Sequence, residues 1–238
     1  MKKIMIVNTS AEYYEGTRKP TGLWLGELVH FYDYFNSEDY QIDLFNINGG
    51  ETPIDPVSLN PLMLDKLTKA YYNDHTFMEK LKNSPSIREA NPETYDAIYF
   101  TGGHGVMFDF PDNMYIQDAV NEVYRHGGVV AAVCHGIAAV CHGIAALLNV
   151  KDENGRYFIE RKQITGFSNA EEILANRKRL VPFMLESELK IRDAKYNKAK
   201  VPFTSYVQVD NRLVTGQNPQ SPKQVAQAVA RILSGEKK

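Results

Sequence analysis

Cysteine is scarce in this chain of 238 residues, which contains only Cys134 and Cys141. Seven residues of α-helix rise roughly 10.5 Å and seven residues of strand extend further, whereas the Cα atoms of a disulfide lie within about 7 Å of each other. Within regular structure these two cysteines therefore do not pair. Free thiols are typical of a reducing compartment, so we expect a cytoplasmic protein.

The chain also lacks an excess of charge of one sign and a long apolar run. Its 27 basic and 29 acidic residues give a formal net charge of −2. Without a basic block or an acidic tail, nothing favours nucleic acid or an anionic membrane as a partner. No apolar stretch approaches the ~20 residues of a membrane span. The apolar run at residues 4–7 is too short for a signal peptide, and we interpret it as part of a buried strand.

Short apolar segments alternate with segments of helical spacing along the whole sequence. The pattern predicts strands at 3–8, 40–47, 95–100, 129–133, 201–209 and 212–215, helices at 21–35, 112–126, 181–194 and from 222, two short helices within 53–83, and a hairpin at 156–164. This alternation indicates a single α/β domain over residues 1–238, with a mostly parallel sheet and helices on both faces. Such sheets bind ligands at the carboxyl ends of their strands.

Two predicted strand ends carry sequence that suits catalysis. Thr101-Gly-Gly-His-Gly105 follows one strand, and Cys134-His-Gly follows another. A strand followed by Cys-His-Gly and small residues is typical of a nucleophile elbow, because glycine and alanine avoid clashes in the tight turn. A helix N-terminus there favours the thiolate. The backbone N–H groups of His135 and Gly103 are our candidates for binding an oxyanion; the alternative is an inert core cysteine.

Five segments resemble the PfpI-like superfamily, which has the flavodoxin-like, class I glutamine amidotransferase-like fold, and within it the glyoxalase III and heat-shock chaperone subgroup. They are residues 21–30, 96–111, 132–136, 164–172 and 213–219. The resemblance implies an enzyme without cofactor or metal and with a Cys-His-acid triad. By position the triad is Cys134, His135 and Glu172, with Glu171 as the less favoured acid. Glu27 is implied to contact the sulfur, unless it lies on the polar face of its helix.

The Cys-His-Gly motif, which the superfamily has once, occurs twice here, because residues 132–138 and 139–145 are identical. Seven added residues turn a helix roughly 700°, within about 20° of two full turns, so a helix lengthened after Cys134 keeps its buried face. An odd insertion into the preceding strand would reverse its side chains. On this register argument we favour Cys134 and His135 over Cys141 and His142, although the duplication can also abolish activity. Adjacent Cys and His do not have the spacing of zinc ligands, so we expect no metal site.

The absence of any histidine after His142 argues against glutamine amidotransfer, whose triad histidine lies far downstream of the cysteine. The resemblance implies a homodimeric glyoxalase III, or D-lactate dehydratase, that converts the small dicarbonyl methylglyoxal to D-lactate without glutathione. The alternative is a stress-related holding chaperone or redox sensor, since a low-pKa thiol oxidises readily. Repair of glycated side chains would use the same cysteine. For His104 we favour a packing role over substrate polarisation.

Overall fold

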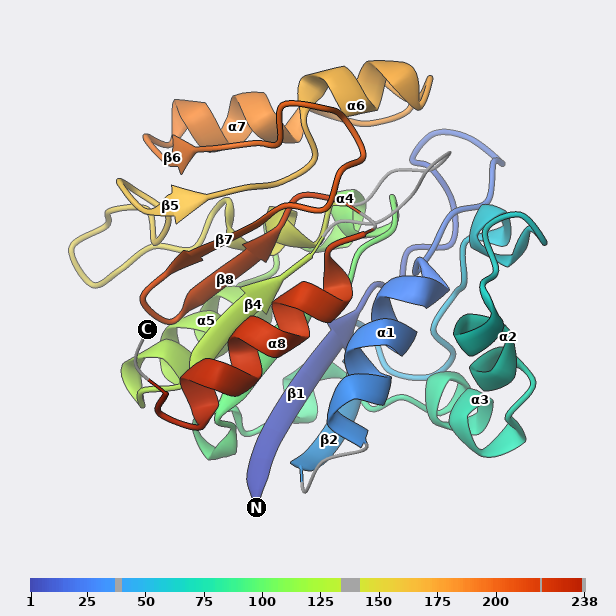
Figure 1. Cartoon of the computed structure of the whole chain (residues 1–238), viewed down its shortest axis with the longest axis horizontal. Coiled ribbons are helices and arrows are strands. Elements are labelled where there is room, and N and C mark those ends of the chain that lie inside the picture. The colour runs from blue at the N-terminus through green and yellow to red at the C-terminus, as the bar shows by residue number, and fades with distance from the viewer. Residues whose placement is uncertain (37–39, 134–141, 219, 237–238) are drawn as a thin grey trace.

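A six-stranded sheet in the order β2-β1-β3-β4-β8-β7 forms the centre of the computed structural model, which describes residues 1–36, 40–133, 142–218 and 220–236 (Figure 1). The strands are β1 (Lys2–Asn8), β2 (Tyr40–Asn46), β3 (Ala97–Phe100), β4 (Val129–Ala132), β7 (Val207–Asp210) and β8 (Leu213–Gly216). All neighbours are parallel except β7 and β8, which form an antiparallel pair at one edge. The predicted mostly parallel α/β fold is thus confirmed.

Helices cover both faces of this sheet. They are α1 (Leu25–Asn36), α2 (Lys66–Tyr72), α3 (His75–Lys82), α4 (Val106–Asp109), α5 (Met114–Arg125), α6 (Asn169–Leu174), α7 (Leu185–Ile191) and α8 (Pro222–Leu233), with 3-10 helices η1 (Pro56–Leu59), η2 (Ile87–Glu89), η3 (Pro92–Thr94) and η4 (Gly143–Leu147). In Figure 1, α1 and α8 lie in front of the sheet and α5 lies behind it. None of the helices in the described part of the chain is both long enough and apolar enough to traverse a membrane.

Alternate side chains of the central strands divide between two apolar cores. On β1, Ile4 and Ile6 pack in the core beneath α1 and α8, whereas Met5 and Val7 pack in the core on the side of α5. A strand that is buried on both faces needs apolar residues at every position, since no side chain reaches water. This requirement explains the continuous apolar runs that the sequence shows at its strands.

Some predicted elements are wrong in detail. The predicted hairpin at 156–164 does not form; instead, β5 (Gln163–Ile164) pairs in parallel with β6 (Lys195–Tyr196), far along the chain. The strand predicted at 201–209 begins only at Val207. The backbone N–H of Gln163 also donates to the Asp210 side chain. These partners are brought together by tertiary packing, which local sequence patterns do not encode.

The carboxyl ends of the parallel strands meet at one edge of the sheet. There β1 leads into Thr9, β3 into the glycine-rich segment 101–105, and β4 into Val133. The described chain resumes at His142, which is followed by the short helix η4. The side chains at this edge form the candidate site.

Candidate active site

Gly143 fixes the backbone of the second Cys-His-Gly copy against the ends of β3 and β4. A Cβ atom at this residue would lie 2.6 to 2.8 Å from the carbonyl oxygens of Thr101, Phe100 and Val133. Real Cβ atoms do not approach backbone oxygens so closely, so only glycine fits. Although Val133 and Gly143 are separated by nine intervening residues, they are in direct contact. His142 is thereby held at the carboxyl edge of the sheet.

His142 pairs with Glu172, the acid that sequence analysis favoured for the triad. Its Nε2 lies 3.0 Å from Oε2 of Glu172, and the two side chains are 0% and 2% exposed. Within the described residues, neither ring nitrogen of His142 and neither carboxylate oxygen of Glu172 forms an aligned hydrogen bond, so the 3.0 Å approach is a close contact of the two groups. A buried carboxylate against one imidazole nitrogen orients the ring.

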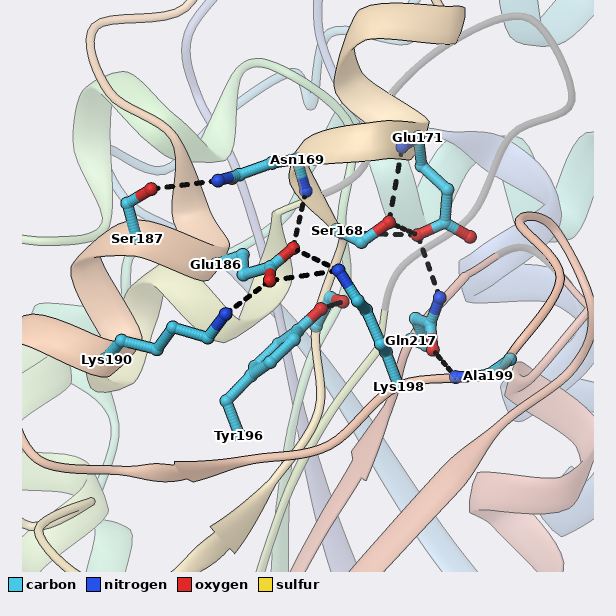
Figure 2. A network of polar contacts seen from close by, with 11 residues as sticks. Ser168, Asn169, Glu171, Glu186, Ser187, Lys190, Tyr196, Lys198, Ala199 and Gln217 are labelled. Carbon is cyan, nitrogen blue, oxygen red and sulfur yellow. Dashed lines mark hydrogen bonds and ion pairs between the residues drawn. The ribbon is translucent and has the colours of Figure 1, made fainter.

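The neighbouring Glu171 has a different set of contacts (Figure 2). Its Oε2 accepts hydrogen bonds from the backbone N–H and the hydroxyl of Ser168 and from the side-chain amide of Gln217. Its Oε1 accepts from the backbone N–H of Phe203 and the side chain of Asn218. Together with the Ser168 hydroxyl, which accepts from the backbone N–H of Glu171, this arrangement is a capping box at the start of α6. Glu171 therefore stabilises the start of α6, whereas Glu172 faces His142.

A second buried carboxylate fixes the same end of α6. Glu186 on α7 accepts from the backbone N–H of Asn169 and from the ammonium groups of Lys190 and Lys198 (Figure 2). Burial alone would raise the pKa of Glu186, but these donors outweigh it and hold that pKa below its usual value. The first turn of α6 is thus anchored from two sides, and this anchoring sets the position of Glu172.

The glycine-rich segment after β3 packs against the residues that lead into α1. Gly103 has φ +118°, and a Cβ there would lie 2.0 Å from the carbonyl oxygen of Gly22. The backbone N–H of Trp24 donates to Gly102. Glu27, in the first turn of α1, is completely buried, so it does not lie on an exposed polar face. The close backbone approach therefore brings the first turn of α1 to the edge that carries His142.

His104 is a buried neighbour of His142, and no hydrogen-bond partner for it occurs among the described residues. Its ring centroid lies 5.7 Å from that of His142 and 5.1 Å from that of Tyr14. Burial, with a further contribution from His142, holds the pKa of His104 well below its usual value, so the ring is neutral. Neither ring nitrogen has a partner among the described residues. The contact with Tyr14 agrees with the expected packing role.

Asp109 joins α4 to the loop after β1 at the same edge. Its Oδ2 accepts from the hydroxyl of Thr9 and the backbone N–H of Ser10, whereas its Oδ1 has no partner within the described residues. Burial raises the pKa of Asp109 to about 7. Sequence analysis gave no role to this residue, because an aspartate in a short helix carries no local sign of burial.

Three of the sequence-predicted residues, Cys134, His135 and Cys141, lie outside the described residues, so their roles and the oxyanion role of His135 stay predictions. Among the described residues the structure brings His142, Glu172 and His104 together. Tyr14, which packs on His104, was given no role by the sequence analysis. Its burial follows from the path of the loop after β1, which sequence periodicity does not reveal.

Comparison with known proteins agrees with the fold. The model of the DJ-1/PfpI family matches residues 26–137. The glutathione-independent glyoxalase HSP31 of Saccharomyces cerevisiae is 32% identical, over 94% of this chain and 95% of its own length. The chain belongs to the DJ-1/PfpI family. Its full-length relatives at about 30% identity place it in the glutathione-independent glyoxalase subgroup, as the sequence resemblance implied.

Solved structures of DJ-1/PfpI proteins superpose closely on this chain. Rapid Encystment Protein 24 KDa of Francisella tularensis is 42% identical, with a TM-score of 0.91 and coverage of 98% of this chain and 99% of that one. Glyoxalase III of Candida albicans is 29% identical, with a TM-score of 0.84 and coverage of 97% of each chain. The similarity therefore extends over the whole chain.

Proposed function

We propose that this DJ-1/PfpI protein is a glutathione-independent glyoxalase that converts methylglyoxal to D-lactate through a thiol of the doubled segment. The observation that carries the proposal is the buried pair of His142 and Glu172, because His142 directly follows a cysteine in the sequence. A cysteine with an adjacent base that is itself oriented by a carboxylate is the arrangement of an activated nucleophile. The curated relatives are glutathione-independent glyoxalases, which supports the reaction class.

The described residues favour the second copy of the motif as the site. His142 contacts the acid, and Gly143 packs on the ends of β3 and β4. Strand β4 keeps its register with β3, so the cost that we expected for this assignment, a shifted strand, is not incurred. We therefore assign Cys141 as the nucleophile and His142 as the base, with Cys134 and His135 as the competing pair.

The match to the family model does not choose between the copies. It ends at residue 137, inside the doubled segment. Because the two copies are identical, an alignment that continues from β4 without a gap meets Cys134 first. The contacts of His142 are therefore the stronger argument, since they depend on position in space and not on order along the chain.

The proposed reaction needs no external oxidant or reductant. The Cys141 thiolate adds to the aldehyde carbon of methylglyoxal, and the carbonyl oxygen takes a proton to give a hemithioacetal. His142 removes the hydrogen of that carbon, a carbon–carbon double bond forms, and the ketone oxygen is protonated to give an enediol. A proton is then delivered to the second carbon, with Glu27 as a further proton donor, and the hydroxyl on the first carbon gives up its proton to the base, which yields a lactoyl thioester. Water cleaves the thioester and releases lactate and the thiol.

Paired variants of the two copies test this assignment. We expect Cys141→Ala and His142→Ala to lower kcat/KM for methylglyoxal at least roughly 100-fold, the size of a lost general base or nucleophile. We expect Cys134→Ala and His135→Ala to stay near wild type. The measurement is D-lactate formation without glutathione. The opposite pattern would assign the site to Cys134 and His135, and turnover by the double cysteine variant would refute a thiol mechanism.

A single-copy variant provides a control for the duplication. Deletion of residues 132–138 gives the same sequence as deletion of residues 139–145, so one protein represents both. We expect it to fold and to turn over methylglyoxal at least as fast as the full chain. If the single-copy protein is active while the full chain is not, the duplication itself blocks the reaction. Absence of turnover in both, together with suppression of client aggregation, would favour the chaperone alternative.

A further inference from the structure

Phe203 has an unusual backbone conformation for an aromatic residue. It is the third residue of the turn Val201-Pro202-Phe203-Thr204, which the backbone N–H of Thr204 closes by donating to the carbonyl of Val201, and its φ is +61°. Proline at the second position and a positive φ at the third are the features of a type II turn, which favours glycine at the third position. A bulky side chain in the left-handed region strains the backbone. Such strain persists only where the surrounding structure imposes it, and it is concentrated at functional sites.

Hydrogen bonds to buried side chains hold this turn in place. The backbone N–H of Phe203 donates to Oε1 of Glu171 at 2.8 Å. The side-chain amide of Asn218 donates both to the same oxygen and to the carbonyl of Thr204. Glu171 and Asn218 are completely buried. The turn is therefore fixed to the carboxylate that caps α6, and this carboxylate is adjacent in the chain to Glu172.

The side chain of Phe203 is connected to His142 through one further aromatic ring. The ring centroid of Phe203 lies 6.1 Å from that of Phe167. The centroid of Phe167 lies 5.9 Å from that of His142, and these two rings meet edge to face at 65°. Aromatic pairs attract each other at centroid separations of roughly 4.5–7 Å. Phe167 and His142 are buried, whereas Phe203 is partly buried, so Phe203 is the outermost of three rings in series.

The orientation of the His142 ring depends on the ring of Phe167. Contact with Glu172 at Nε2 places one atom of the imidazole, but a contact at one atom does not by itself fix the plane of a ring. Phe167 packs against that ring. The backbone of Phe167 directly precedes Ser168, the N-cap residue of α6, so the direction of its ring is set by its side-chain torsions and by the side chains packed on it. Phe203 is one of these neighbours.

We propose that Phe203 is a positioning residue for His142: its ring holds Phe167 against the imidazole and so keeps His142 in the orientation that proton transfer requires. The inference rests on the proposed function, in which His142 is the general base, and it adds a residue that acts only through another ring. Glycine at residue 203 would relieve the backbone strain but would leave Phe167 without its outer neighbour. The aromatic residue in the strained turn is explained by this requirement.

Three substitutions separate the role of the Phe203 ring from that of its backbone. Phe203→Tyr keeps the ring and the strain, Phe203→Ala keeps the strain without the ring, and Phe203→Gly has neither. We expect the Tyr variant to stay near wild type. The Ala and Gly variants should both lower kcat for methylglyoxal roughly tenfold with little change in KM, because the base is misplaced while substrate contacts are kept. Urea denaturation should nevertheless give the Gly variant a higher midpoint than the Ala variant, since glycine accepts a positive φ.

The matched control is Arg161→Gly. Arg161 has φ +60°, and its side chain is 78% exposed, so glycine there relieves a similar strain without removing a ring; kcat should not change. Wild-type kcat in both ringless variants would overturn the proposal. A loss of kcat in Phe203→Ala but not in Phe203→Gly would show that activity follows stability, which assigns Phe203 a purely structural role and also overturns it. A raised KM with unchanged kcat would place the ring against substrate and overturn it as well.

NMR spectroscopy of the histidine rings tests the positioning without turnover. Long-range ¹H–¹⁵N spectra at pH 8 report which ring nitrogen carries the proton, and His142→Gln identifies the signals of His142. A carboxylate beside Nε2 favours the proton on that nitrogen. We expect wild type, Phe203→Tyr and Arg161→Gly to share this pattern, and the Ala and Gly variants to shift towards the average of two tautomers. Unchanged His142 signals in the two ringless variants overturn the proposal whatever the turnover. If the signals shift as expected but the wild type does not turn over methylglyoxal, the glyoxalase assignment fails and the positioning of His142 by Phe203 stands.

Discussion

Glu171 and Glu172 are adjacent on α6 and both are buried, yet their surroundings differ. Glu171 accepts hydrogen bonds from Ser168, Gln217, Phe203 and Asn218. Glu172 is in ion-pair contact with His142. The first carboxylate is saturated by hydrogen-bond donors, and the second faces the imidazole of His142. The two buried carboxylates thus differ in their partners and not in their burial.

Other buried polar groups near α6 and His142 also differ in whether they have hydrogen-bond partners. The carboxylate of Glu186 is satisfied by two lysines and a backbone N–H, whereas the nitrogens of His104 have no partner among the described residues. Because an unsatisfied buried polar group destabilises the fold by about 1–3 kcal/mol, such groups persist only where the surrounding structure holds them. The saturated network around α6 provides that support.

Replacing each of the two glutamates in turn by glutamine should give the largest difference in activity and stability between two variants. We expect Glu172→Gln to lower kcat/KM for methylglyoxal at least roughly 100-fold, because the amide does not stabilise the protonated imidazole. We expect Glu171→Gln to lower the free energy of unfolding by about 2 kcal/mol, because it replaces charged acceptor bonds by weaker neutral ones. Chemical denaturation and D-lactate formation measure the two effects. Equal losses of activity and of stability in both variants would contradict the difference between Glu171 and Glu172.

Asp109 is an intermediate case, since one of its oxygens is satisfied and the other is not. Burial raises its pKa to about 7, so the folded state keeps a proton that the unfolded state loses near pH 4. The folded state therefore binds more protons between about pH 4 and pH 7, and this group's contribution to stability falls as the pH rises through that interval. Relative to Asp109→Asn, the wild type should lose on the order of 3 kcal/mol from pH 4 to pH 8. Denaturation of both proteins across this pH range measures the difference between their free energies of unfolding. A difference that does not change with pH would contradict the prediction.

The smallest effect is expected at the cap of α6. Ser168→Ala removes the hydroxyl that accepts from Glu171 N–H and donates to its carboxylate, and should cost about 1 kcal/mol of stability. If the anchoring of α6 sets the position of Glu172, kcat/KM should also fall, by a smaller factor than in Glu172→Gln. Ser187→Ala, which removes the hydroxyl at the Asn169 side chain on the same network, is the matched comparison. A drop in activity without any loss of stability in Ser168→Ala would contradict the anchoring.

The apolar pattern of the sequence was sufficient to predict the central strands, because each is buried on both faces and must be apolar throughout. It was not sufficient for α6, whose six residues give too few turns for a helical pattern, nor for β5, whose partner lies some thirty residues away. Glu172 was proposed as the triad acid from its place in a segment that resembles the family. The register argument, which favours His135 over His142, does not include contacts between distant segments such as that of His142 with Glu172.

By itself, the sequence determined the layered α/β fold, the edge of the sheet at which a site forms, and the kinds of side chain present there. These follow from local rules, since burial and turns constrain each residue together with its near neighbours. Only the tertiary structure decided that His142 contacts Glu172 and that Glu171 is saturated by hydrogen-bond donors. Those relations join residues far apart in the chain, and two identical sequence copies become different only through the contacts that each one makes.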